Sequence, residues 1–580
     1  MSNLASKAEN QVRKIVSDAL KSAMESGALC QCELPAISVE IPADTSHGDY
    51  SSNAAMACAR AFRCAPAKIA AEIVSRADLS DTFFTSVETA GPGFLNFRLS
   101  PSYFSQVVLD VLEKGDEYGR SDYGQGKKVM VEFVSANPTG PMHLGNARGG
   151  ALGDCLASLL DTAGYDVWRE FYVNDAGNQI DKFGLSLDVR YLQLCLGEDA
   201  VEMPEDAYHG DDIREHAAAF KEINGDSYVS KSEEERRAAL VAYALPLNIQ
   251  KMQADLRKYR IEYDLWFLES TVHKSGELAE TIKILTDRGL TYEKDGGLWY
   301  KNTEVMTAKL KAEGKSDEEI AKLELKDDCL IRPNGNPTYF AADIAYHRNK
   351  FLRGFDTCIN FWGADHHGHV ARMKGAMDAV GLDGEKLKVV LFQLVKLVRN
   401  GEVVRMSKRS GKAIQLADLL DEVPVDAARF FFNLREANTG LDFDLDLAVS
   451  QTSQNPVYYV QYAHARICSI LKNLSAEGIV AREAAPGELD LLTAPEEREL
   501  IRHLAAYTGA VVNCAQILDS SGMTRYAVEL ATLFHKFYNA CRVKCGDESL
   551  MQARLSLCLA VRQAVKNLLT MLGIDAPEVM

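Results

Sequence analysis

The segment SANPTGPMHLGNARGG, residues 135–150, combines residue types that packing alone rarely brings together. It follows an apolar, β-branched run and precedes a stretch with helical spacing, so we expect it to join the end of a strand to the start of a helix. In open α/β sheets ligands bind at that edge, and the free amides of a helix N-terminus favour anions. Gly140 and Gly145 allow a ligand to approach the backbone closely, and His143 adds a donor. The pattern predicts a phosphate site, although a Pro/Gly connector with an incidental histidine would have the same composition.

A second segment, VRNGEVVRMSKRSGKAI, reverses the charge of the chain locally. The net charge of the chain is −18, yet residues 396–412 hold six basic residues and one acidic residue, Glu402. Gly401 and Gly411 bracket the motif, so we expect a loop that closes on negative charge as a polyphosphate leaves. A solvated basic turn is the alternative. Because the chain contains no G-x-x-x-x-G-K-[ST] pattern, its phosphate site must use other means.

The elements that position these segments form three predicted modules. Residues 1–115 read as an α+β module, with an amphipathic helix followed by two short strands around a Gly-Pro-Gly turn. Residues 125–445 show the strand–helix–strand order of a parallel α/β sheet, with a charged helical insertion at about 196–250. Residues 446–580 carry helical patterns without strands, which predicts an all-α domain.

Composition limits the class of protein. Hydrophobic residues make up 47 % and charged residues 25 % of the chain, which is ordinary for a globular protein. No apolar run approaches the roughly 20 residues of a membrane helix, and the N-terminus lacks the apolar core of a secretory signal, so we expect a cytoplasmic protein with no membrane partner. The thirteen cysteines are scattered without paired C-x-x-C knuckles, so no dedicated metal site is predicted.

The two segments together resemble the HIGH and KMSKS signatures of class I aminoacyl-tRNA synthetases. The first stands here as HLGN, beginning at His143, and the second as RMSKR. Asn146, Arg405 and Arg409 depart from the consensus, whereas the central lysine, Lys408, is kept. Within that class VEFVSANPTGPMHLGN, TYFAADIAYH, GADHHGH, NPVYYVQYAHAR and FHKFYNACRV resemble bacterial arginyl-tRNA synthetases. HGDYSSNAAM and AGPGFLNF are similar to the additional N-terminal domain of that family, and DAARFFFNLR resembles the motif that names its anticodon-binding domain.

The resemblance covers essentially the whole chain and implies a fold and a reaction. The fold is α/β: a Rossmann-type parallel-sheet catalytic domain, an α+β N-terminal domain that binds tRNA, and an all-α C-terminal anticodon-binding domain. The reaction joins L-arginine to ATP as arginyl-adenylate with release of pyrophosphate, then transfers arginine to the 3′-terminal adenosine of tRNA(Arg). The family also implies a monomer that requires tRNA before the first step.

Family resemblance further assigns the catalytic and nucleotide-binding residues. It implies catalysis by His143, Asn146 and Lys408, with Mg²⁺ carried on ATP. The implied ATP site consists of Pro138, Gly140, His143, Gly145, Asn146, Gly363, Asp365, His366, Met406, Ser407 and Lys408. A metal site made of His366, His367 and His369 is the alternative for GADHHGH, but neighbours so close in sequence seldom surround one tetrahedral ion.

Arginine recognition requires fixed acceptors for a planar guanidinium with five donors. Glu132 lies on the first predicted strand of the sheet, and Tyr339 and Asp343, four residues apart, would share one face of a helix. An ordinary half-buried helix with an exposed acid would show the same pair. The resemblance implies arginine binding by Glu132, Asn137, Tyr339, Asp343 and His367.

The last module carries an aromatic stripe at helical spacing. Tyr459, Tyr462 and Arg466 form a stripe suited to splayed bases, which stack on rings and guanidinium planes. Packing of these tyrosines on a neighbouring helix explains the stripe equally well. The resemblance implies tRNA binding by Tyr459, Tyr462, Arg466, Tyr538 and Met580.

Three other functions compete with this interpretation. A cysteinyl enzyme would need a zinc constellation, and the leucyl, isoleucyl and valyl enzymes a large editing insertion that the motif spacing does not easily hold. A binding protein with a degenerate nucleotide site would not need His143, Lys408 and Asp343 together. A small-molecule nucleotidyltransferase would not carry the helical last module.

Overall fold

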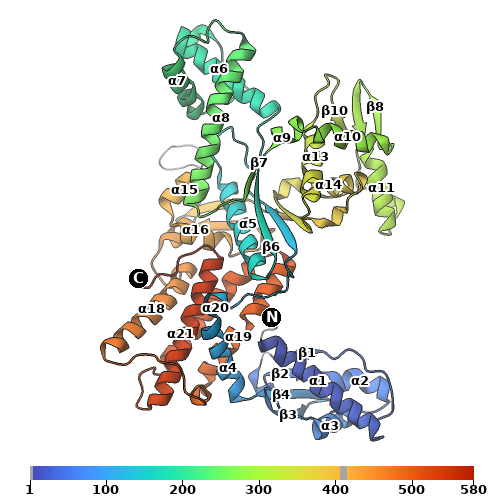
Figure 1. Ribbon diagram of the computed structural model, residues 1–580, viewed down its shortest axis with the longest axis vertical. Helices are drawn as coiled ribbons and strands as arrows, with labels where there is room; N and C mark the ends of the chain where they lie inside the picture. Colours follow the sequence, from blue (N-terminus) through green and yellow to red (C-terminus); the bar gives the residue numbers. More distant parts are fainter. Residues whose placement is uncertain (1–3, 43, 405–413) are drawn as a thin grey trace. The chain divides into compact units, whose positions relative to one another are not determined.

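The computed structural model describes residues 4–42, 44–404 and 414–580, which form two compact units (Figure 1). One unit combines Met1–Tyr123 with Thr452–Ile517 and Gly522–Met580. The other consists of Gly124–Gln451 and Leu518–Ser521.

The first unit begins with a four-stranded antiparallel sheet in the order β1-β2-β4-β3 and three helices. Its amphipathic first helix buries the apolar positions that the sequence places at helical spacing, among them Val12, Val16 and Leu20. The predicted pair of strands around the Gly-Pro-Gly turn is β3 and β4. The elements are α1 (Leu4–Glu25), β1 (Val39–Glu40), β2 (Tyr50–Ser52), α2 (Ala54–Phe62), α3 (Pro66–Arg76), β3 (Phe84–Ala90) and β4 (Phe94–Leu99).

Four long helices form the rest of this unit: α18 (Pro456–Ala476), α19 (Pro495–Ile517), α20 (Ser521–Ala540) and α21 (Glu548–Met571). A fifth helix, α4 (Pro101–Lys114), comes from the N-terminal part of the chain and packs against α19 and α21. The polar run that follows it also belongs to this packing. Tyr118 is buried, and its hydroxyl donates a hydrogen bond to the Leu504 carbonyl at 2.7 Å. This buried ring fixes the polar segment to the helices.

The second unit is built on the parallel sheet that the sequence predicts. Its order is β12-β11-β5-β6-β7, and every neighbouring pair is parallel. The strands are β5 (Lys128–Glu132), β6 (Asp166–Val173), β7 (Leu265–Leu268), β11 (Thr357–Gly363) and β12 (Leu387–Phe392). The helix α5 (Leu144–Thr162) joins β5 to β6. Gly153 lets this helix lie flush on the sheet, because a Cβ at that position would clash with the Phe133 ring.

Two groups of elements are inserted between the strands, on different sides of the sheet in Figure 1. The helices α6 (Asn178–Leu196), α7 (Asp211–Asn224) and α8 (Glu233–Lys258) share a core around Phe183, Tyr191 and Phe220. The second group is an antiparallel sheet, β8 (Thr291–Lys294), β9 (Gly297–Tyr300) and β10 (Asp328–Ile331), with helices α9 (Glu269–Lys274), α10 (Glu277–Asp287), α11 (Asn302–Ala312) and α12 (Asp317–Ala321). The helices α13 (Tyr339–Leu352) and α14 (His367–Ala379) pack on that group.

After β12 the chain leaves the parallel sheet. Gln393 donates its backbone N–H to the Ala437 carbonyl at 2.9 Å, and the chain then enters a second sheet, ordered β14-β13-β15. Its strands are β13 (Val395–Arg399), β14 (Glu402–Val404) and β15 (Leu441–Asp444), with helices α15 (Leu416–Glu422), α16 (Val425–Phe432) and α17 (Leu445–Val449). The DAARFFFNLR segment forms α16 in this second unit, where the buried Arg429 donates to Asp154 at 2.5 Å. It is therefore part of the α/β unit and not of the helical one.

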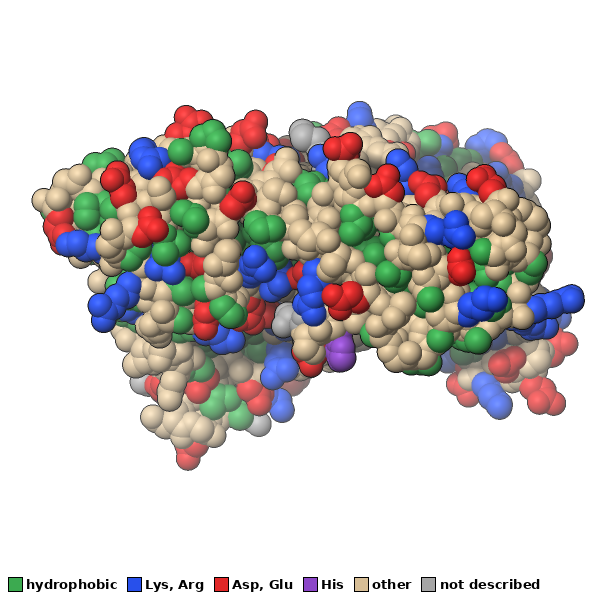
Figure 2. Space-filling model, turned by 90° about the horizontal axis from the view of Figure 1, so that it is seen from below, with side chains coloured by type: hydrophobic (Ala, Val, Ile, Leu, Met, Phe, Trp, Pro, Cys, Tyr) green, Lys and Arg blue, Asp and Glu red, His purple; other side chains and the backbone are tan. Residues whose placement is uncertain are grey.

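The surface mixes charges of both signs. On the face shown in Figure 2, lysine and arginine side chains are interspersed with aspartate and glutamate, without a large area of one sign. Within the described ranges, every helix is too short or too polar to cross a membrane.

Candidate active site

The chain turns sharply where β5 ends, and the turn places Ser135 beside Glu132. Val134 and Ser135 have φ angles of 70° and 43°, a left-handed conformation that costs most for a β-branched residue. Ser135 Oγ donates a hydrogen bond to Glu132 Oε1 at 2.9 Å and accepts one from the Tyr172 N–H at 3.2 Å. The strained turn therefore fixes one carboxylate oxygen of Glu132 at the strand end.

The HLGN segment starts α5 at this same edge of the sheet. The His143 N–H donates to Asn146 Oδ1 at 2.8 Å, so the residue that replaces the consensus histidine caps the helix. A cavity of about 580 Å³ opens beside it and is lined by Asn137, Gly140, His143 and Asn146. The helical insertion also contributes to the lining, through Gln179, Tyr208, His209, Gly210, Asp212 and Ile213. Pro138 and Gly145 belong to the same loop and helix start but do not line this cavity.

The helical insertion also holds the loop directly. Asn248, buried on α8, donates from Nδ2 to the Pro138 carbonyl at 2.9 Å. His216 on α7 donates from Nε2 to Asn248 Oδ1 at 2.8 Å, which fixes the orientation of the amide. Sequence reasoning missed both residues, because nothing in their local pattern marks a contact that spans 110 positions.

The second signature lies outside the described residues, and so do the predicted ATP ligands Met406, Ser407 and Lys408. From residue 414, where the described chain resumes, the next two residues contact the first signature. Gln415 forms an antiparallel bridge with His143, and the Leu416 N–H donates to the Met142 carbonyl at 2.9 Å. The chain that follows the basic segment is therefore held beside HLGN.

A second cavity, of about 590 Å³, brings together most of the residues predicted to bind arginine and adenosine. Glu132, Tyr339, Asp343, Asp365 and His366 all line it. The other lining residues come mainly from α13, β11 and α14: Tyr172, Phe340, Tyr346, His347, Asn360, Trp362, Gly368, His369 and Arg372.

Three predicted residues do not line that second cavity. Asn137 lines the first cavity instead, and Gly363 ends β11 next to the second one. His367 is exposed at the first position of α14, whereas His369, two residues on, lines the cavity. Two positions rotate a helix by about 200°, so only one of these histidines can face the cavity. His367 does not line the cavity in this structure, and its predicted contact with arginine stays a prediction.

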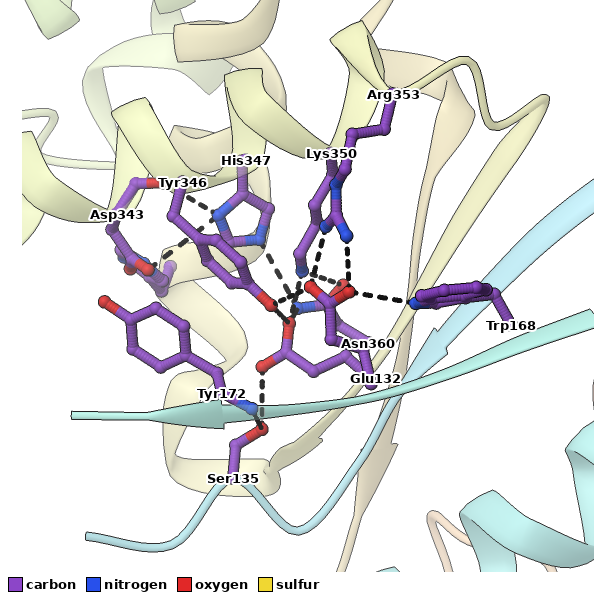
Figure 3. Close-up of polar contacts among 12 residues, drawn as sticks. Glu132, Ser135, Trp168, Tyr172, Asp343, Tyr346, His347, Lys350, Arg353 and Asn360 are labelled. Atoms are coloured by element: carbon purple, nitrogen blue, oxygen red, sulfur yellow. Dashed lines mark hydrogen bonds and ion pairs between the residues drawn. The ribbon is translucent and has the colours of Figure 1, made fainter. Parts of the chain in front are cut away.

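The Glu132 carboxylate is buried and is already paired within the protein (Figure 3). Lys350, on α13 and fully buried, makes an ion pair with Glu132 Oε2 and donates to Asn360 Oδ1 at 3.1 Å. Asn360 Nδ2 donates to the same Glu132 oxygen at 2.9 Å. Burial raises the pKa of Glu132, but the charge and hydrogen bond of Lys350 outweigh burial and hold that pKa below its usual value. Glu132 is thus an ionised but internally compensated group.

A second buried carboxylate, Glu170 on β6, is compensated from the same helix. Arg353 binds it through two hydrogen bonds of 2.6 and 2.7 Å, and the Tyr346 hydroxyl lies 2.8 Å from its Oε1. Lys350 near the end of α13 and Arg353 just after it therefore compensate the carboxylates of two neighbouring strands. Lys350 and Arg353 follow Asp343 at helical spacing, and this pattern is the sequence signal that could have predicted these ion pairs.

Asp343 lines the same cavity and, unlike Glu132, is partly exposed. Its side chain is 34 % exposed, and Oδ2 accepts a hydrogen bond from His369 Nε2 at 2.9 Å. Burial alone would raise the pKa of Asp343. The hydrogen bond from His369 and nearby positive charges outweigh burial and hold the pKa below its usual value, so the group is ionised at neutral pH. His347, one turn along α13, donates from Nδ1 to the Asp343 carbonyl at 2.9 Å. Burial lowers the pKa of His347 to about 4, so this imidazole is neutral.

In the aromatic stripe of the first unit, one tyrosine is exposed and another packs on a neighbouring helix. The Arg466 guanidinium lies over the Tyr538 ring at 4.4 Å and over the Tyr462 ring at 5.9 Å, and Tyr462 is exposed. Tyr459 packs instead on His535 of α20, with ring centres 5.1 Å apart.

Met580, also predicted to bind tRNA, is exposed at the end of the C-terminal tail. The tail is held to α18 by Gln461 and His464, which donate to the carbonyls of Asp575 and Pro577. These two residues lie on a different face of α18 from Tyr462 and Arg466.

The described ranges contain no group of three or more histidine, cysteine, aspartate or glutamate side chains placed to hold a metal ion.

Three family models match successive parts of the chain. They are the arginyl tRNA synthetase N-terminal domain over residues 10–99, the catalytic domain of tRNA synthetases class I (R) over 107–467, and the DALR anticodon binding domain over 460–580. The catalytic-domain model alone covers more than half of the chain. The chain belongs to the arginyl-tRNA synthetase family. Membership confirms the resemblance and the predicted fold class, and it removes the other synthetases and the nucleotidyltransferases as candidates.

Relatives of the family match at full length. An arginine–tRNA ligase of Ruminiclostridium cellulolyticum is 53 % identical, and one of Caldanaerobacter subterraneus 52 % identical, each over 100 % of both chains. A solved structure from Campylobacter jejuni, described as an arginyl-tRNA synthetase, is 32 % identical with a TM-score of 0.72 over 83 % of this chain and 100 % of its own. The Thermus thermophilus arginyl-tRNA synthetase, 23 % identical, shares the fold with a TM-score of 0.71 over 99 % of this chain and 100 % of its own. The family and these relatives confirm the predicted enzyme class.

Proposed function

We propose that the two cavities at the carboxyl edge of the central sheet form one site that activates L-arginine with ATP and charges tRNA(Arg). An arginine carboxylate oxygen attacks the α-phosphorus of ATP, the bond to the β-phosphate oxygen breaks, and pyrophosphate leaves. A ribose hydroxyl of the 3′-terminal adenosine of tRNA then attacks the carbonyl carbon, and AMP leaves. The activity is that of the family, arginine–tRNA ligase.

The observation that carries this proposal is an acidic cavity beside a phosphate-type loop. Asp343 offers an ionised carboxylate to the guanidinium, and Tyr339 stands one turn before it on α13. Glu132, compensated by Lys350, is proposed to be a polar wall of the arginine site, and Asn137 reaches the substrate from the neighbouring cavity. A lysine substrate would leave acceptors of this site unpaired, which supports discrimination without editing.

The nucleotide is proposed to lie between the signatures. His143 and Asn146, with the backbone at Pro138, Gly140 and Gly145, face the phosphates. Asp365 and His366 at the cavity edge, together with Gly363, contact adenosine. Met406, Ser407 and Lys408 complete the site from the segment that ends at the bridge to His143. Mg²⁺ arrives on ATP and shares its phosphate charge. The substrate carboxylate is ionised at neutral pH, so the first step needs positioning and charge stabilisation and no general base.

For tRNA, we propose that residues 446–580 read the anticodon arm and residues 1–115 contact another part of the molecule. Tyr462, Arg466 and Tyr538 form the surface on which a splayed base stacks. Tyr459 supports that surface through His535, and Met580 extends it only if the tail moves from its present attachment.

The proposal is tested by pyrophosphate exchange with each proteinogenic amino acid, with and without tRNA(Arg). Arginine alone should support exchange, and only with tRNA present. Asp343→Asn should raise the arginine KM far more than the ATP KM, because it removes charge from the guanidinium site. Exchange with another amino acid, or equal changes in both KM values, would contradict the proposed site.

A further inference from the structure

The hydrogen bond between His369 and Asp343 joins two helices at the wall of the arginine cavity. His369 lies on α14 and Asp343 on α13, and both side chains line the cavity. The distance from Nε2 to Oδ2 is 2.9 Å, and the two side chains are 20 % and 34 % exposed. The proposed reaction uses Asp343, but His369 has no role in it so far.

The surroundings of His369 hold its ring in one orientation. The ring lies 5.2 Å from Trp362 and 5.8 Å from Phe340, measured between ring centres. Arg372, one turn later on α14, lies over the Phe340 ring at 4.9 Å and is held by an ion pair with Asp328 of β10. The aromatic contacts therefore aim Nε2 at Asp343 before any substrate is present.

No equivalent support comes from the other histidine near Asp343. His347 Nδ1 donates to the backbone carbonyl of Asp343 and lies 3.8 Å from its Oδ1, beyond hydrogen-bond distance. Burial keeps His347 neutral, because its pKa is lowered to about 4. Of these two histidines, only His369 bonds the carboxylate itself.

We propose that His369 is a positioning residue that presents Asp343 to the guanidinium of arginine. A carboxylate has about four lone-pair sites, so Oδ2 can keep the His369 bond while the rest of the group accepts two guanidinium N–H donors. Without that bond, the Asp343 side chain, which is 34 % exposed, would sample other rotamers. Binding of arginine would then include the entropic cost of ordering this side chain. His369 acts through Asp343 and takes no part in the phosphoryl transfer. The inference rests on the proposed arginine site.

The experiment compares His369→Ala, His369→Gln and Lys374→Ala by aminoacylation, with the KM for arginine and for ATP measured separately. Alanine removes the donor, so the arginine KM should rise about tenfold, with kcat and the ATP KM within about twofold of the parent. Glutamine places an amide nitrogen near the position of Nε2 and should restore most of the arginine KM. Lys374 is the matched control: it lies on the same helix, is 21 % exposed and pairs with Glu385 at 2.9 Å, but it does not line the cavity.

The double variant Asp343→Asn/His369→Ala separates positioning from a general loss of structure. The His369 change should add little to the arginine KM of Asp343→Asn, because the carboxylate it positions is already gone. Full additivity, an unchanged arginine KM in His369→Ala, or a glutamine variant as impaired as alanine would overturn the proposal. Failure of the proposed function looks different, because the parent enzyme would then show no arginine-dependent activity at all.

Discussion

Replacing Lys350 with methionine should destabilise the α/β unit strongly at neutral pH. Lys350 is fully buried, and its ammonium compensates the buried carboxylate of Glu132. Removing one member of a buried ion pair costs about 3–5 kcal/mol, because the remaining charge is left without a partner. Glu132 would keep hydrogen bonds of 2.9 Å from Asn360 and from Ser135, so we expect the lower end of that range, about 3 kcal/mol.

The assay is urea denaturation followed by tryptophan fluorescence. All four tryptophans, Trp168, Trp266, Trp299 and Trp362, lie in the α/β unit, so the signal reports the unfolding of that unit. The loss should depend on pH. Without Lys350, burial raises the pKa of Glu132 above its unfolded value, so the folded state takes up a proton more readily than the unfolded state. The deficit should therefore shrink as pH falls from about 8 to about 5.

Two further variants complete this test. Glu132→Gln/Lys350→Met removes both charges, and it should regain most of the stability that Lys350→Met loses. Lys283→Met removes an exposed cation that pairs with Asp287 on α10 of the same unit, and it should leave the urea midpoint unchanged. The reasoning is refuted if Lys350→Met matches the parent at about pH 8, or if the double variant is no more stable than Lys350→Met.

Three further variants test other parts of the structure. The parent should lose about 3 kcal/mol of stability as pH falls from 6.5 to about 4, because His347 is protonated over this range in the unfolded state but stays neutral in the folded state. The variant His347→Gln should remove this pH dependence in urea titrations. Asn248→Ala should raise the ATP KM about fivefold through loss of the Pro138 hydrogen bond, and an altered arginine KM alone would contradict this. Arg466→Ala should weaken tRNA binding about tenfold in filter-binding assays while leaving the Tm unchanged.

The sequence predicts the β5–α5–β6 unit well, because an apolar β-branched run, a Gly/Pro loop and a glycine-ended helix all agree locally. The antiparallel sheet β8–β10 was not predicted. Its strands have four residues each and carry several charged side chains, so they lack a periodic signal and depend on contacts distant in sequence.

The candidate site was predicted residue by residue but not in its charge balance. Glu132 was predicted to bind arginine, and only the fold shows that Lys350, 218 positions away, pairs with it. His369 was not predicted, for a similar reason. The resemblance gives a segment, whereas the start of α14 decides which histidine faces the cavity.

The central claim is that a cationic amino acid and a nucleotide meet at one edge of the parallel sheet. A crystal structure with a non-reactive sulfamoyl analogue of arginyl-adenylate tests it most directly. The guanidinium should lie within hydrogen-bond distance of Asp343, the sulfamoyl group should face His143, and the adenosine should contact Asp365. A guanidinium bound away from Asp343, or a nucleotide bound away from HLGN, would contradict the account.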